Sequence, residues 1–223
     1  MPDAATIPGI IDRAIAAATA FGVEQREVVL VRHGQPLPEP ERRESELLDP
    51  PLSALGRRQA ERAALALDGV TAVFCSDLAR AGETAAIVGG RLGVPVRETA
   101  GLREITVFRG DLGDAAAWTS AAAAFVSGGR WESFLKPDPA SEFRLRVRRA
   151  FAEIASDHAT GTVAVVCHSG VINAHLADTL SLDRDYFVRP AHASLSRVCL
   201  SSGRWVLQSV NETAHLRPDW LTA

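Results

Sequence analysis

The stretch Val28-Val29-Leu30-Val31-Arg32-His33-Gly34-Gln35 organises this chain of 223 residues. Its four apolar residues predict a buried strand, and a cation and an imidazole follow directly where the strand ends. In a mostly parallel sheet that position lies at the carboxyl edge, where ligands bind. Arginine and histidine together suit phosphoryl transfer, which needs a positioned nucleophile and neutralised oxyanion charge. A short motif needs support from further elements downstream.

Strands alternate with helices along the rest of the chain. Apolar runs predict strands at 28–31, 72–75 and 162–167. Helical patterns start at Ser53 and about Val171 and cover 78–92 and 142–157. Two short strands at 195–200 and 205–210, separated by Ser-Gly, indicate a hairpin. We therefore expect an α/β fold of three layers, a mostly parallel sheet flanked by helices with an antiparallel edge.

No composition shift marks a domain boundary, so we expect one domain over 27–223. Residues 1–26 are expected to form an N-terminal helical extension, because apolar residues recur at helical spacing over 7–21. That helix could pack on the domain, mediate dimerisation or cover the site. Residues 105–140 are expected to form a cap-like insertion over the site, with a short helix in the alanine-rich segment 115–124.

Composition narrows the function classes. Hydrophobic residues make up 47% and charged residues 23%, which is typical of a soluble globular protein. A net charge of -3 gives no general electrostatic case for nucleic acid or an anionic membrane. No stretch has the length of a membrane span, and the N-terminus lacks the basic region of a signal peptide. Cys75, Cys167 and Cys199 lie in apolar runs and predict buried thiols in a reducing cytoplasm.

Three further segments accompany the first motif. Ser76-Asp77-Leu78-Ala79-Arg80-Ala81-Gly82-Glu83-Thr84-Ala85 follows the second strand, Leu102-Arg103-Glu104 comes next, and Val166-Cys167-His168-Ser169-Gly170 ends the third. His33 and His168 both follow strands, so we expect them to meet at the carboxyl edge although 135 positions (168 − 33) separate them.

In order and spacing these segments resemble the histidine phosphatase superfamily, the phosphoglycerate-mutase-like proteins. The segment Pro51-Leu52-Ser53-Ala54-Leu55-Gly56-Arg57-Arg58-Gln59-Ala60 resembles that family's helix after the first loop, and the likeness runs from about residue 27 to about 200. It implies that His33 is the phosphorylated nucleophile, Arg32 and Arg80 clamp the phosphoryl oxygens, His168 donates to them and Glu104 is the general acid. Ser169 would bind phosphate at the start of the next helix.

The chemistry of these residues leads to the same roles. A neutral imidazole can attack phosphorus if its other nitrogen donates to a nearby carbonyl. Glu104 must be protonated to act as an acid, so burial should raise its pKa. Glu104 could instead pair on the surface with Arg103 or Arg109, leaving Asp111 and Asp114 as the next candidates for the acid. Arg80 could likewise form a surface salt bridge with Glu83 or Asp77.

The chain also departs from the family pattern. Many relatives have Glu-Thr and then an asparagine after Arg-His-Gly, whereas this chain has Gln35-Pro36, so Gln35 is the candidate for that phosphate contact. Cys167-His168-Ser169 stands where many relatives have Gly-His-Gly, and the segment after Glu104 only loosely follows their Gly-x-Trp-x-Gly run. The family's substrate preference therefore does not carry over.

Other chemistries lack their motifs. The six histidines show no metal-ligand spacing, so no metal and no cofactor are expected. A cysteine phosphatase would need an arginine where Asn173 stands, and Ser169 lacks the flanking glycines of a hydrolase elbow. No Walker A loop is present.

We expect a metal-independent phosphomonoester hydrolase that acts on a small phosphorylated metabolite through a phosphohistidine. The alternatives are a phosphoglycerate mutase-type phosphotransferase and a non-catalytic phosphate-binding module. Relatives with mutase activity usually carry a longer insertion after the acid, and the segment from Glu104 to Glu142 is short. The expected partners are the substrate and, for the N-terminal helix, a second copy in a homodimer; nucleic acid and membranes are not expected.

Overall fold

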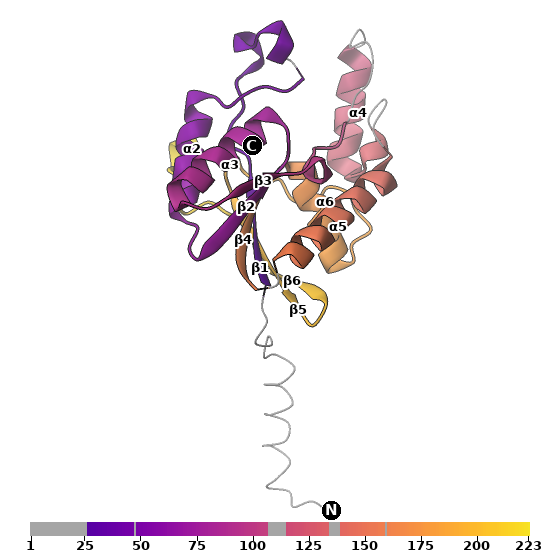
Figure 1. Ribbon diagram of the computed structural model, residues 1–223. Helices are drawn as coiled ribbons and strands as arrows, with labels where there is room; N and C mark the ends of the chain where they lie inside the picture. Colours follow the sequence, from indigo (N-terminus) through magenta and orange to yellow (C-terminus); the bar gives the residue numbers. More distant parts are fainter. Residues whose placement is uncertain (1–25, 47, 107–114, 134–138, 159) are drawn as a thin grey trace, which may run out of the picture.

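The computed structural model describes residues 26–46, 48–106, 115–133, 139–158 and 160–223, and a six-stranded sheet forms its centre (Figure 1). The strands follow the order β3-β2-β4-β1-β5-β6. Four of them are parallel to one another: β1 (Arg26–Arg32), β2 (Val70–Cys75), β3 (Val96–Glu98) and β4 (Gly161–Cys167). The antiparallel strands β5 (Leu195–Ser201) and β6 (Arg204–Glu212) form one edge.

Helices cover both faces of the sheet. In Figure 1, α2 (Ala54–Leu65) and α3 (Ala79–Leu92) lie on one side, and α5 (Ala140–Asp157) and α6 (Ser169–Leu180) lie on the other. The helix α4 (Ala115–Gly128) stands above α5 in this view. The three layers predicted from the alternation of strands and helices are confirmed.

The central strands are apolar on both faces because both faces are covered. Val29 and Val31 of β1 belong to the core beneath α2 and α3, whereas Val28 and Leu30 belong to the core beneath α5 and α6. All four side chains are buried. This explains why β1 is a continuous hydrophobic run rather than an alternating one.

The predicted elements agree with the structure apart from their ends. The antiparallel hairpin and the helix in the alanine-rich segment are confirmed, and α6 begins at Ser169, two residues before the predicted start at Val171. Strand β3 was not predicted, because it has only three residues and all of them are exposed, so it lacks the apolar run that marks the other strands. The N-terminal helix over 7–21 lies outside the described residues, so its packing and the domain limits stay predictions, as does the cap role of 105–140.

Local contacts fix the loop that follows β1. The hydroxyl of Ser53 accepts the backbone N–H of Gly56 at 3.0 Å and caps the start of α2. A Cβ atom on Gly34 would overlap the backbone of Gly56, and one on Gly56 would overlap the backbone of Gln35. The glycine after His33 therefore lets the loop lie directly against the first turn of α2.

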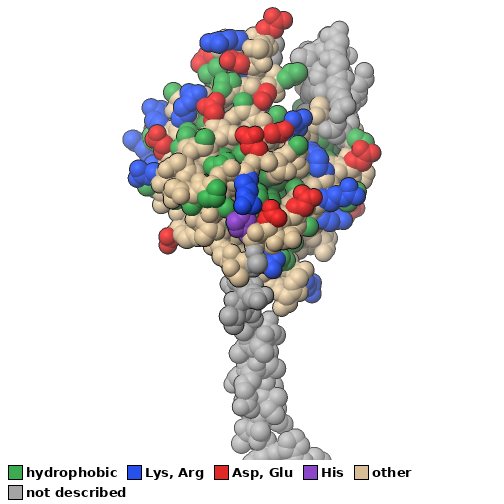
Figure 2. All heavy atoms as spheres, in the orientation of Figure 1, with side chains coloured by type: hydrophobic (Ala, Val, Ile, Leu, Met, Phe, Trp, Pro, Cys, Tyr) green, Lys and Arg blue, Asp and Glu red, His purple; other side chains and the backbone are tan. Residues whose placement is uncertain are grey.

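On the face drawn in Figure 2, basic and acidic side chains are interspersed over the domain. No helix within the described ranges combines the length and the apolar character needed to cross a membrane.

Candidate active site

The strand-end residues converge as the sequence predicts. Arg32 ends β1 opposite Cys167, the last residue of the parallel neighbour β4, so His33 and His168 emerge side by side. Their ring centroids are 5.1 Å apart. His33 is 5% exposed and His168 is fully buried.

His33 has one engaged nitrogen and one that faces a cation. Nδ1 lies 2.8 Å from the carbonyl oxygen of Gly34, which can only accept, so Nδ1 carries the proton. Nε2 then holds a lone pair, and Arg80 donates its Nε–H to it at 3.3 Å. Burial lowers the pKa of His33 well below its usual value, and His168 and Arg80 lower it further. The ring is therefore neutral at neutral pH, the form that can attack phosphorus.

Arg32 lies beside His33 with part of its guanidinium unused. One terminal nitrogen donates to the carbonyl of Pro190, while the buried Nε has no partner among the described residues. Both ring nitrogens of His168 are also buried without a partner in that part of the chain. Buried polar atoms normally have hydrogen-bond partners. Unpartnered nitrogens on Arg32 and His168, next to each other and to His33, are therefore the features of a site that binds an anion.

Arg80 comes from the first turn of α3 and is held by Asp49. A terminal nitrogen of Arg80 lies 3.5 Å from the Asp49 carboxylate. The same carboxylate accepts the backbone N–H of Ala79 at 2.9 Å and so satisfies the start of α3. One side chain from the 36–51 loop thus orients both the helix and the arginine.

Arg80 forms neither of the surface salt bridges, with Glu83 or with Asp77, that the sequence left open. Glu83 pairs with Arg57 at 2.8 Å, and Asp77 pairs with Arg103 through two hydrogen bonds. Arg80 remains directed at His33.

Glu104 lies at the N-terminus of α6. Its Oε2 accepts the backbone N–H of Gly170 at 3.0 Å, and its Oε1 accepts the N–H of Ile105 at 2.9 Å. Burial raises the pKa of Glu104, although these two backbone groups and the arginines act in the opposite direction. Arg103 is engaged with Asp77 instead, so the surface pairing with Arg103 was wrong. Arg109, Asp111 and Asp114 lie outside the described residues.

Ser169 and Gly170 contact Glu104 in the structure, whereas the sequence predicts that the start of this helix binds phosphate. The Ser169 hydroxyl donates to Oε2 of Glu104 at 3.4 Å, and a Cβ atom on Gly170 would overlap the Glu104 carboxylate. The group that meets this helix N-terminus in the structure is therefore Glu104. Whether Ser169 also binds phosphate stays a prediction.

Gln35 follows His33 and Gly34 in the loop. Its backbone N–H donates to Oε1 of Gln59 at 2.8 Å, and its own Oε1 accepts the Ser53 hydroxyl at 2.9 Å. The side-chain oxygen of Gln35 is thus engaged with Ser53.

One residue beside His33 was not predicted from the sequence. His192 is 7% exposed, and its ring centroid lies 5.5 Å from that of His33. The signal was available: His192 precedes β5, and the start of an antiparallel strand lies at the edge where its parallel neighbours end.

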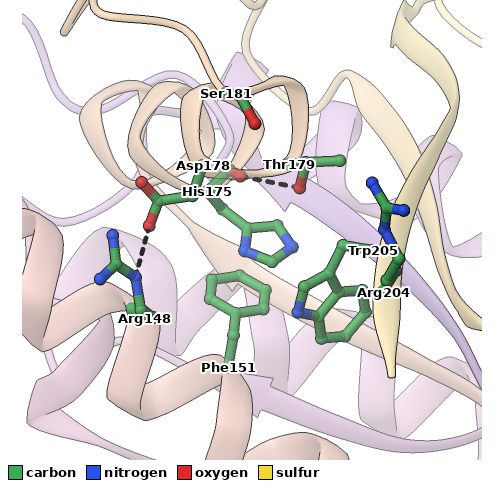
Figure 3. Close-up of a pocket in the computed structure, with 8 residues that line it drawn as sticks. All are labelled: Arg148, Phe151, His175, Asp178, Thr179, Ser181, Arg204 and Trp205. Atoms are coloured by element: carbon green, nitrogen blue, oxygen red, sulfur yellow. Dashed lines mark hydrogen bonds and ion pairs between the residues drawn. The ribbon is translucent and has the colours of Figure 1, made fainter. Parts of the chain in front are cut away.

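A hollow lies away from these residues. It has a volume of about 290 Å³ and is lined by α5, α6 and β6 (Figure 3). His175 stacks on Phe151 there, with ring centroids 3.7 Å apart, and Arg148 pairs with Asp178. The hollow adjoins the C-terminal half of α6, whereas His168 and Glu104 lie at the N-terminus of that helix. None of the motifs contributes to it.

Metal ligands do not gather in the described part of the chain. No group of three or more His, Cys, Asp or Glu side chains there could hold a metal ion.

Comparison with known proteins identifies the family. The model of the histidine phosphatase superfamily (branch 1) matches residues 28–213. The chain belongs to this superfamily. A relative from Yersinia enterocolitica, named probable phosphoglycerate mutase GpmB, is 29% identical over 207 residues, which cover 85% of this chain and 94% of the relative.

Similar solved structures agree with the fold. Bacillus stearothermophilus YhfR has a TM-score of 0.72 at 24% identity and covers 86% of this chain and 100% of its own. A mycobacterial glucosyl-3-phosphoglycerate phosphatase in complex with VO3 has a TM-score of 0.67 at 27% identity, and the match covers 84% of this chain and 100% of that one. Phosphatases and mutase-like proteins are thus both among the similar proteins.

Proposed function

We propose that this member of the histidine phosphatase superfamily is a metal-independent phosphomonoester hydrolase that acts on a small phosphorylated metabolite through a phosphohistidine at His33. The observation that carries the proposal is the neutral His33 ring. Its Nδ1 proton is held by Gly34 and its Nε2 lone pair faces Arg80. A lone pair on a neutral imidazole, directed at a guanidinium that can bind phosphoryl oxygens, is the arrangement that in-line attack on a phosphoryl group requires.

In the first step, Nε2 of His33 forms a bond to phosphorus while the phosphorus–oxygen bond to the alcohol breaks. Arg32, Arg80 and His168 neutralise or bind the phosphoryl oxygens. Glu104 gives its proton to the departing oxygen, a role that the raised pKa of this carboxyl supports.

In the second step, a water molecule attacks the phosphorus of the phosphohistidine. The nitrogen–phosphorus bond breaks, and inorganic phosphate leaves with the oxygen of that water. Glu104, now a carboxylate, accepts the proton from the water and returns to its acid form. His33 regains its lone pair.

A mutase is the second candidate, favoured by the likeness to the Yersinia protein named probable phosphoglycerate mutase. The hydrolase is preferred because the segment between Glu104 and Glu142 is short, which leaves little chain to shield a phosphohistidine from water. The 27% identity with a glucosyl-3-phosphoglycerate phosphatase supports the same choice.

The test is turnover of a panel of sugar, nucleotide, acyl and nitrophenyl phosphates with added chelator, with phosphoglycerate mutase activity assayed in parallel. Hydrolysis should persist in chelator and label the protein with acid-labile, base-stable phosphate. His33→Ala should abolish both signals, and His168→Ala should reduce turnover about a hundredfold or more. Arg57→Ala, which breaks a surface ion pair, is the control and should act like wild type.

Three results would overturn the proposal. Activity restored only by a divalent ion would contradict metal independence, and normal rates in His33→Ala would end the phosphohistidine mechanism. Transfer of phosphate between substrate positions at rates far above hydrolysis would identify a mutase.

A further inference from the structure

The segment that carries His192 is joined to the nucleophile through the backbone. The N–H of Ala193 donates to the carbonyl oxygens of Arg32 at 3.0 Å and His33 at 3.2 Å. Arg32 in turn donates to the carbonyl of Pro190. These bonds hold the His192 ring beside His33 at nearly the separation seen for His168, 5.5 Å against 5.1 Å.

His192 is buried in the same electrostatic surroundings as the other two histidines. Burial, with Arg32 and Arg80 adding to it, lowers the pKa of His192 to about 3. The ring is therefore neutral at neutral pH. Whether it can donate a hydrogen bond to an anion depends on which ring nitrogen carries the proton.

The hydrogen bonds around Gln59 decide that question. The backbone N–H of Gln35 can only donate, so the atom facing it at 2.8 Å is the Gln59 oxygen. The Gln59 amide nitrogen then donates to the carbonyl of Trp220 at 2.7 Å and to the hydroxyl of Thr222 at 3.0 Å. Thr222 Oγ1 is thus an acceptor from Gln59.

The hydroxyl proton of Thr222 still needs an acceptor. Nδ1 of His192 lies 2.9 Å from Oγ1 and is the other partner of that oxygen within the described ranges. If Thr222 donates to Nδ1, every donor in the series of hydrogen bonds that links Gln59, Thr222 and His192 has an acceptor. The neutral ring then carries its proton on Nε2, the nitrogen that points away from Thr222.

We propose that His192 is a third histidine of the phosphate site, whose Nε2–H donates to a phosphoryl oxygen and whose tautomer is set by the Thr222 hydroxyl. The proposal rests on the proposed function and adds one phosphate ligand, His192, and one positioning residue, Thr222. Thr222 acts only through His192.

The test uses variants that differ in where the donor lies. A glutamine at position 192 can offer an N–H near the location of Nε2, whereas an asparagine offers one near Nδ1. Thr222→Val removes the hydroxyl at nearly constant shape, and Thr222→Ser restores it. Thr179→Val is the control, because it removes a hydroxyl in the same way at the far end of α6, where Thr179 donates to the backbone carbonyl of His175.

Binding of orthovanadate and inorganic phosphate is measured by calorimetry, and kcat/KM is measured with nitrophenyl phosphate. His192→Asn and Thr222→Val should each weaken anion binding and lower kcat/KM about tenfold or more, the usual effect of losing a hydrogen bond to a charged group. His192→Gln should lie closer to wild type than His192→Asn, and Thr222→Ser closer than Thr222→Val. Thr179→Val should equal wild type.

Equal anion affinity in wild type, His192→Asn and Thr222→Val would overturn the inference. So would equal losses in Thr222→Ser and Thr222→Val, because the hydroxyl would then have no special role. Failure of the proposed function looks different: the wild-type protein would bind anions without hydrolysing phosphomonoesters or labelling His33, and the binding comparison would still test His192.

Discussion

Arg80 donates its Nε–H to Nε2 of His33 across 3.3 Å, so the lone pair of the proposed nucleophile is engaged by this arginine. A phosphoryl group that approaches His33 must take over that guanidinium with its oxygens before the lone pair can attack. In the proposed mechanism, the guanidinium that contacts His33 in the structure is thus the one that neutralises charge in the transition state.

Replacing Arg80 should therefore affect chemistry more than folding. Arg80→Ala should lower kcat about 10²- to 10³-fold, and Arg80→Lys should fall in between because an ammonium lacks the planar pair of donors. Steady-state kinetics and thermal unfolding check this, with Arg57→Ala as a surface control. Rates within about threefold of wild type in Arg80→Ala would contradict a role for Arg80 in binding the phosphoryl oxygens.

Glu104→Gln should slow alkyl phosphates far more than nitrophenyl phosphate. An alkoxide needs its proton in the transition state, whereas a nitrophenolate hardly does. Because burial raises the pKa of Glu104, the acid form persists to higher pH than usual and is lost as pH rises through that pKa. The alkaline loss of kcat/KM on alkyl phosphates should therefore disappear in the variant. Equal losses on both substrates, with phosphorylation of His33 limiting, would assign Glu104 a structural role.

Gly170→Ala should reproduce part of the Glu104 defect without touching the acid. The added Cβ would overlap the Glu104 carboxylate and force it from the N-terminus of α6. We expect a selective loss on alkyl phosphates, measured as the ratio of rates on the two substrate types. Gly90→Ala is the matched control, since a Cβ on this helical glycine meets nothing within 4 Å. An unchanged ratio in Gly170→Ala would show that the acid tolerates displacement.

His175 should contribute to acid sensitivity. Burial lowers the pKa of its ring to about 3, whereas an unfolded histidine titrates near 6.5. Between these values the unfolded state binds a proton that the folded state does not, so the free energy of unfolding falls as pH falls. One such group changes it by up to about 1.4 kcal/mol per pH unit. Urea unfolding in phosphate-free buffer from pH 7 to 5 should give a shallower slope for His175→Gln. Parallel curves would contradict this.

The sequence predicted most of the fold and the meeting of His33 with His168. Both follow from local signals: continuous apolar runs mark strands buried on two faces, and residues after parallel strands share one edge. The carbonyl partner of His33 and the raised pKa of Glu104 were also predicted, and Gly34 and burial account for them.

Three features were not predicted, and each depends on contacts between segments that are distant in the sequence. Asp49 lies in a loop with no regular pattern, yet it holds Arg80. His192 is placed by bonds from its segment to β1, and Thr222 reaches it over 30 positions along the chain. The surface pairing of Glu104 with Arg103 was wrong for a related reason, because Arg103 pairs with Asp77 instead.

Asp49 has a practical consequence for anyone who redesigns this protein. Asp49 belongs to the 36–51 loop, which follows His33 and departs from the family pattern, so we expect substrate preference to lie there. Its carboxylate nevertheless orients the start of α3 and Arg80. Exchanging that whole loop for one from a relative would alter selectivity and catalytic competence together. A graft that ends before Asp49 would separate the two, so that a change in substrate range could be read without loss of the underlying chemistry.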